Sequence, residues 1–97
     1  MRTLRFTQAA RAELIEAQDW YEAQVPGLGA CFRHEIDEVA ERILSRPLMY
    51  PRVFKTVRRA RVKKFPYALF FVAAAGEVLA IGCFHMHRHP RRWKSRA

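Results

Sequence analysis

The chain has 97 residues, of which 51% are hydrophobic, and it carries a formal net charge of +9 at pH 7. This length and composition predict one compact domain over residues 1–97 and exclude an intrinsically disordered chain. The longest apolar run, Tyr67 to Ala75, is far shorter than the roughly 18 residues that cross a bilayer, and no signal peptide is evident, so a cytoplasmic protein without a membrane partner is expected.

The N-terminal part predicts a strand followed by a helical hairpin. Residues 3–6 are expected to pair as a short strand, and Thr7 offers a hydroxyl as the N-cap of a helix over residues 8–24. The break at residues 25–29 is short, so a second helix is expected to fold back on the first. This second helix is expected to end near Arg46, because the proline that follows disfavours a helical conformation there.

The remainder of the chain predicts an antiparallel sheet. Four runs rich in Val, Phe, Tyr and Ala are expected as strands, namely Val53 to Val57, Arg59 to Phe65, Tyr67 to Ala73 and Val78 to His85. A hairpin turn with Gly76 at a positive φ is expected between the last two. The order βααββββ predicts an α+β fold, in which an N-terminal short strand and an α-helical hairpin pack with a four-to-five-stranded, mainly antiparallel sheet.

Charge is divided unevenly along the sequence. Residues 1–41 hold four Arg or Lys and eight Asp or Glu, a net −4, whereas residues 42–97 hold fourteen and one, a net +13. This asymmetry predicts an acidic face and a strongly basic face. The basic face is expected to attract phosphates or acidic protein surfaces, and the alternative is a solvated surface with no partner.

Cations and apolar residues alternate in the second predicted strand. In order they are Arg59, Ala60, Arg61, Val62 and Lys63. Because successive side chains of a strand point to opposite faces, the three cations are expected on one face of the sheet. With their neighbours Arg58 and Lys64 they suit phosphate contact. The alternative is a protected edge strand, in which cations deter pairing with another chain.

The C-terminal segment from Phe84 to Arg96 combines five Arg or Lys residues with three histidines and a tryptophan. Cations beside an aromatic ring suit phosphate contact and base stacking, and they equally suit an acidic protein groove. A solvated basic tail is the third interpretation. The candidate binding residues here are His87, Arg88, Arg91, Arg92 and Trp93.

Few residues are suited to catalysis or metal binding. His85 is a candidate general base, a hydrogen-bonding anchor, or a structural residue at a strand end. It would share one strand face with Cys83 and two further histidines, but the surrounding cations and missing carboxylates disfavour a metal site, and no metal or other cofactor is expected. Both Cys31 and Cys83 are expected as reduced core residues. Every acidic residue except Glu77 lies in the first 41 positions, on helix surfaces expected to face solvent.

A series of motifs in order resembles the ParE/RelE toxin superfamily over nearly the whole chain. The motifs are Trp20-Tyr21-Glu22, Pro26-Gly27-Leu28-Gly29, Pro47, Tyr50-Pro51, Arg58-Arg59, Phe65-Pro66-Tyr67, His85, Arg88, Pro90 and Trp93. The resemblance implies a growth-inhibiting toxin of a type II toxin-antitoxin system. It also implies a hetero-oligomer with a cognate antitoxin, whose C-terminal region is expected to be acidic where it covers the basic face.

The motifs look closer to the ParE-like branch, which inhibits DNA gyrase by binding it, than to the RelE-like branch, which cleaves mRNA on the ribosome. The candidate target-binding residues are Arg58, Arg59, Arg61, Lys63, Lys64, Tyr67, His87, Arg88, Arg91, Arg92 and Trp93. For the alternative, a ribosome-dependent mRNA endoribonuclease, the candidate catalytic residues are Arg59, Arg61, Lys64, His85 and Arg88. RelE-like nucleases commonly use a tyrosine near the C-terminus, where this chain has Trp93, and the ParE-like assignment is therefore preferred.

Overall fold

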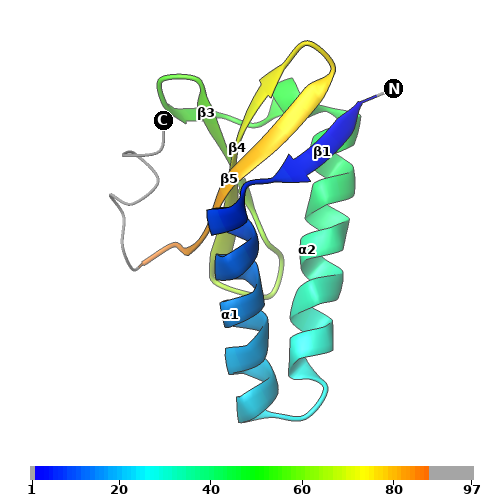
Figure 1. The fold of residues 1–97 in the computed structure, drawn as a ribbon, viewed down its shortest axis with the longest axis vertical. Coiled ribbons are helices and arrows are strands. Elements are labelled where there is room, and N and C mark those ends of the chain that lie inside the picture. The colour runs from blue at the N-terminus through cyan, green and yellow to red at the C-terminus, as the bar shows by residue number, and fades with distance from the viewer. Residues whose placement is uncertain (1, 88–97) are drawn as a thin grey trace.

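The computed structural model describes residues 2–87 as two antiparallel helices packed on one face of a five-stranded sheet (Figure 1). The elements are β1 (Thr3–Phe6), α1 (Gln8–Gln24), α2 (Leu28–Ser45), the short 3-10 helix η1 (Pro47–Met49), β2 (Arg52–Phe54), β3 (Val57–Arg61), β4 (Tyr67–Ala74) and β5 (Glu77–His85). The strand order is β1-β5-β4-β3-β2, with β1 parallel to β5 and the other pairs antiparallel. The predicted α+β fold is confirmed.

The helical hairpin begins and turns where the sequence predicts. The Thr7 hydroxyl accepts a hydrogen bond from the backbone N–H of Ala10 at 3.1 Å, which is the expected N-cap of α1. Gly27 has a φ of 90°, a conformation that favours glycine, and it redirects the chain into α2. The carboxylate of Glu22 accepts hydrogen bonds from the N–H groups of Gly27 and Gly29, both at 2.9 Å, and thereby satisfies donors at the start of α2.

The main core lies between the two helices and the sheet. It joins Leu14 and Ala17 of α1 to an apolar stripe on α2 and to the inner face of the sheet. The buried members from α2 and the sheet are Phe32, Ile36, Val39, Ile43, Ala60, Val62, Leu69, Phe71, Val78 and Cys83. A second apolar cluster is formed by residues of β2, β3, β4 and β5 and by Met86 after β5, and its buried members are Val57, Ala68, Phe70, Ile81 and Phe84.

Two of the predicted strands have the wrong bounds. The run from Val53 to Val57 contains a turn, because Lys55 has a φ of 52° and separates β2 from β3. The run from Arg59 to Phe65 is interrupted as well, since β3 ends at Arg61 and Lys64 has a φ of 71° in the turn that leads to β4. Residues other than glycine rarely adopt positive φ, yet each of these turns has a lysine in that conformation. Neither turn contains the glycine or asparagine that normally marks such a turn in a sequence.

Two other expectations also require correction. Cys31 is exposed on α2, whereas Cys83 is buried as expected, and both are free thiols. Glu35 does not face solvent, because only 8% of the residue is exposed and its carboxylate lies 3.5 Å from the Lys64 ammonium. In the part of the chain that the structure describes, neither helix combines the length and apolarity needed to cross a membrane.

Candidate target-binding surface

The two arginines of the predicted stripe lie on the sheet face opposite the helices. Arg59 is paired with Phe70 on β4, and Arg61 is paired with Ala68. Since directly paired residues share a face, these arginines lie beside the second apolar cluster. Ala60 and Val62 are buried in the main core on the other side. The predicted alternation of cations and apolar residues is therefore present from Arg59 to Val62, but Lys63 lies in the turn after the strand.

Four cations line one groove at the outer edge of β3. The groove has a volume of about 300 Å³ and is lined by Arg42, Tyr50, Pro51, Arg59, Arg61 and Lys63. No carboxylate is present among its described lining residues. Four like charges brought together in this way repel one another, and a negatively charged partner relieves that repulsion. The groove is thus suited to phosphate or to carboxylate side chains.

The groove lies where the edge of the sheet is uncovered. β2 is short and pairs with β3 only near Val57 and Arg58, while the N–H of Arg59 donates to the Pro51 carbonyl at 3.2 Å. No described strand continues this pairing alongside Ala60 and Arg61. Cations at such an edge deter unwanted pairing with other strands, so edge protection and anion binding are compatible roles for the same side chains.

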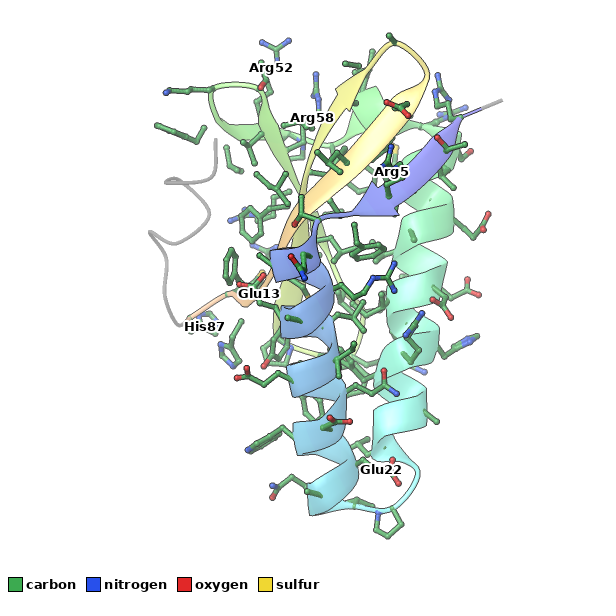
Figure 2. The ribbon with its side chains drawn as sticks, viewed as in Figure 1. Arg5, Glu13, Glu22, Arg52, Arg58 and His87 are labelled. Carbon is green, nitrogen blue, oxygen red and sulfur yellow. The ribbon has the colours of Figure 1, made fainter. Side chains whose placement is uncertain are left out.

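Two of the candidate binding cations have partners within the fold. Arg58 donates hydrogen bonds from Nη1 to the carbonyl oxygens of Tyr50 at 2.6 Å and Leu48 at 3.4 Å, and Figure 2 shows it beside Arg52 at the end of the sheet where β2 and β3 meet. Lys64 lies 3.5 Å from the carboxylate of Glu35. Arg58 and Lys64 therefore contribute to the local structure of the chain, which the sequence alone did not indicate.

Among the described candidate nuclease residues, His85 lies on the opposite face of the sheet from Arg59 and Arg61. Tyr67 and His85 form a directly paired couple on β4 and β5, with ring centroids 5.3 Å apart. Tyr67 packs against the main core on the helix side, whereas Arg61 points to the opposite side of the sheet. A proton-transferring histidine must reach the same reacting atoms as the cations that stabilise charge. The sheet separates His85 from Arg59 and Arg61.

Of the remaining candidates, the structure describes only His87, which follows β5. His87 is exposed, its N–H donates to Nδ1 of His85 at 3.2 Å, and their ring centroids lie 5.8 Å apart. Arg88, Arg91, Arg92 and Trp93 lie outside the described residues. Within residues 2–87, no group of three or more His, Cys, Asp or Glu side chains is arranged to hold a metal ion.

Sequence reasoning missed three members of the groove, namely Arg42, Tyr50 and its neighbour Pro51. Arg42 comes from α2, where its spacing from Glu38 predicts an ion pair along the helix, but Glu38 instead lies 3.8 Å from Nε2 of His34. Tyr50 comes from the connection after η1. None of the three lies near the arginine stripe in the sequence. Arg42 reaches the groove from α2, whereas the hydrogen bond from the Arg59 N–H to the Pro51 carbonyl holds the connection that contains Tyr50 beside β3.

The sequence matches, over residues 4–90, the family described as "ParE toxin of type II toxin-antitoxin system, parDE". The chain belongs to this family. ParE membership implies a cognate antitoxin as a partner. A search of curated proteins gave no significant match.

One solved structure similar to this ParE-family chain is described as the "Chromosomal ParDE TA system from P. aeruginosa". The similarity has a TM-score of 0.77 and 19% sequence identity, and it covers 88% of this chain and 96% of that chain. At this identity the match supports the fold.

Proposed function

We propose that this ParE-family toxin inhibits DNA gyrase by direct binding, with the groove at the edge of β3 as the contact surface. The observation that carries the proposal is the convergence of Arg42, Arg59, Arg61 and Lys63 on one groove without a described carboxylate. Acidic side chains of a protein target, or phosphates of DNA held by that target, complement this charge.

Binding is favoured over RNA cleavage because of the arrangement of the sheet. Arg59 and Arg61 share the outer face, whereas His85 is paired with Tyr67 on the face that packs against the helices. A binding surface requires only that its cations lie together. A nuclease additionally requires a proton donor or acceptor beside its cations. The groove therefore favours an inhibitor that binds its target without catalysing a reaction.

The same groove is proposed as the surface that the antitoxin masks. An acidic segment of the antitoxin would neutralise the four cations, and it would compete with the target for them. Since the cations are largely solvent-facing, salt is expected to weaken both contacts.

A gyrase supercoiling assay and a translation toeprint assay test the proposal with the purified chain. Inhibition of supercoiling that is relieved by the antitoxin, together with an unchanged toeprint, is the expected result. A new toeprint on translated mRNA without inhibition of gyrase would overturn the proposal and establish the nuclease alternative. The double variant R59A/R61A should lose gyrase inhibition, whereas R33A/R46A, which removes the same charge from α2 and its C-cap, should retain it.

A further inference from the structure

A second cleft, of opposite charge, lies between α1 and the ends of β4 and β5. It has a volume of about 380 Å³, and its principal lining residues are Glu13, Glu16, Trp20, Tyr21, Tyr67 and His85. None of its described lining residues is a lysine or an arginine. In a chain with a net charge of +9, this cleft is a local concentration of carboxylates.

The carboxylates come from one face of α1. Glu13 and Glu16 are separated by one helical turn, which places them on the same side of the helix. Oε1 of Glu13 accepts a hydrogen bond from the N–H of Cys83 at 3.2 Å, and Figure 2 shows Glu13 on the same side of the molecule as His87. Glu16 is exposed, and no described residue forms an ion pair with it. The negative charge of Glu16 is therefore available at the mouth of the cleft.

Aromatic rings continue the cleft from the carboxylates to the end of β5. Trp20 is 53% exposed and meets Tyr21 edge to face, with ring centroids 5.2 Å apart. Tyr21 lies 6.1 Å from Tyr67, which in turn lies 5.3 Å from His85. An exposed tryptophan one turn from a carboxylate offers a cation both a π-face and an opposite charge.

We propose that this cleft receives an arginine side chain of the cognate antitoxin. A guanidinium is planar, stacks on aromatic rings and donates to a carboxylate in a fork geometry, so it fits this combination better than a lysine ammonium does. Phosphate is excluded by the negative charge. The inference rests on the proposed function in one respect, namely that an antitoxin is the partner that covers the chain. That antitoxin carries both signs of charge, acidic at the β3 groove and basic at this cleft.

The chemistry of the cleft is tested by NMR titration of the full chain with the peptide acetyl-Gly-Arg-Gly-amide. We expect the indole N–H of Trp20 and the backbone N–H of Cys83 to shift on binding. The citrulline peptide, which keeps the shape but lacks the charge, is the matched control and should bind far more weakly. Equal shifts with both peptides, or no shifts at either residue, would overturn the proposal.

Variants then assign the residues. Glu16→Gln and Trp20→Leu should each weaken binding of the arginine peptide roughly three- to tenfold, in keeping with a partly exposed ion pair or cation-π contact. Glu38→Gln removes an equivalent charge from α2, outside the cleft, and should leave peptide binding unchanged. Loss of binding in Glu38→Gln equal to that in Glu16→Gln would show only long-range electrostatics, and would overturn a specific site.

The source of the arginine is tested with the antitoxin itself. Glu16→Gln should weaken antitoxin binding by a similar factor while inhibition of gyrase by the toxin alone stays unchanged. If Glu16→Gln binds the antitoxin as tightly as the wild-type chain does, although the wild-type chain binds the arginine peptide, then the arginine does not come from the antitoxin and the inference is overturned. If instead the wild-type chain fails to inhibit gyrase, the proposed target is wrong, and the measurements of antitoxin binding still decide this inference.

Discussion

Arg59 and Phe70 lie directly opposite each other on adjacent strands, on the sheet face that is turned away from the helices. The preceding residue, Arg58, is paired with Phe71, whose side chain is buried in the main core on the helix side. Two consecutive arginines thus point to opposite sides of one sheet. Although the two residues have the same charge, Arg59 lines the groove proposed as a binding surface, whereas Arg58 donates hydrogen bonds to the backbone of the fold.

Replacing both outer arginines is expected to abolish toxicity without unfolding the chain. Both lie at the groove, and neither forms a described hydrogen bond to the backbone through its side chain. The double variant R59A/R61A should therefore change the free energy of unfolding by no more than about 1 kcal/mol, because each surface substitution usually changes it by no more than about 0.5 kcal/mol. Growth arrest on induction and urea denaturation measure the two effects. Full growth arrest by this variant would assign the arginines to edge protection alone.

The neighbouring substitution R58A, unlike R59A/R61A, is expected to lower the free energy of unfolding. It removes the donor that satisfies the carbonyl of Tyr50 at 2.6 Å, in a partly buried position. Because an unsatisfied buried acceptor is costly, the variant should lose about 1–3 kcal/mol of unfolding free energy. R58K, which keeps the charge and one donor group, should lose less. The idea fails if R58A is as stable as R59A in the same denaturation experiment.

The start of α2 depends on a glycine for a steric reason. A Cβ added at Gly29 would lie 2.8 Å from the backbone oxygen of Gln18 and 2.9 Å from Cβ of Glu22. The variant G29A should therefore force α1 and α2 apart, at a cost of about 1–3 kcal/mol measured by thermal or urea unfolding. Ala30→Ser, at the exposed next position, is the control and should be nearly neutral. A stable G29A would mean that the helices separate easily at this end of the hairpin.

The two thiols are expected to differ in reactivity. Burial, with a smaller contribution from the charge of Glu13, raises the pKa of the Cys83 thiol from 9.0 to about 12. Cys31 is exposed, so a thiol reagent at mildly alkaline pH should label Cys31 alone in the native chain and both cysteines in denaturant. Labelling of Cys83 in a native C31S variant at the rate of an unfolded thiol would contradict this.

The same shift has a consequence for stability at high pH. The folded pKa of Cys83 lies above its unfolded value, so the contribution of this proton to stability is complete below pH 9.0 and is lost as the pH rises toward 12. The variant C83A should lose less stability over this interval than the wild-type chain does. Parallel alkaline unfolding curves for the two proteins would rule out the contribution.

Local signals sufficed for much of the fold. The hydroxyl of Thr7 marks the start of the first helix, the break at residues 25–29 marks the turn that follows, and both appear in the structure as expected. In the hairpin between β4 and β5, both Ala75 and Gly76 have positive φ. Of the two, only the glycine indicates a positive φ in the sequence. The strand bounds were misjudged because Lys55 and Lys64 adopt positive φ, against their intrinsic preference.

Only some of the residues that line the groove were predictable from the sequence. Arg59 and Arg61 are recognisable from their alternation with apolar residues, which is a local property of a strand. Arg42 reaches the same groove from α2 through tertiary packing, and spacing within the helix indicates a different partner. The ion pair between Glu35 and Lys64 likewise joins α2 to the turn after β3, two segments that are distant in the sequence. Long-range contacts of this kind have no periodicity in the sequence.

The parallel pairing of β1 with β5 joins the first strand to be synthesised to the last, since Thr3 is paired with Glu77 and Phe6 with Ala80. Residues 3–6 therefore have no partner strand until translation has passed position 80. A chain that stops before β5 cannot complete this sheet. The native sheet therefore forms as a whole only when β5 is available to pair with β1, so its folding depends on residues that are more than seventy positions apart in the sequence.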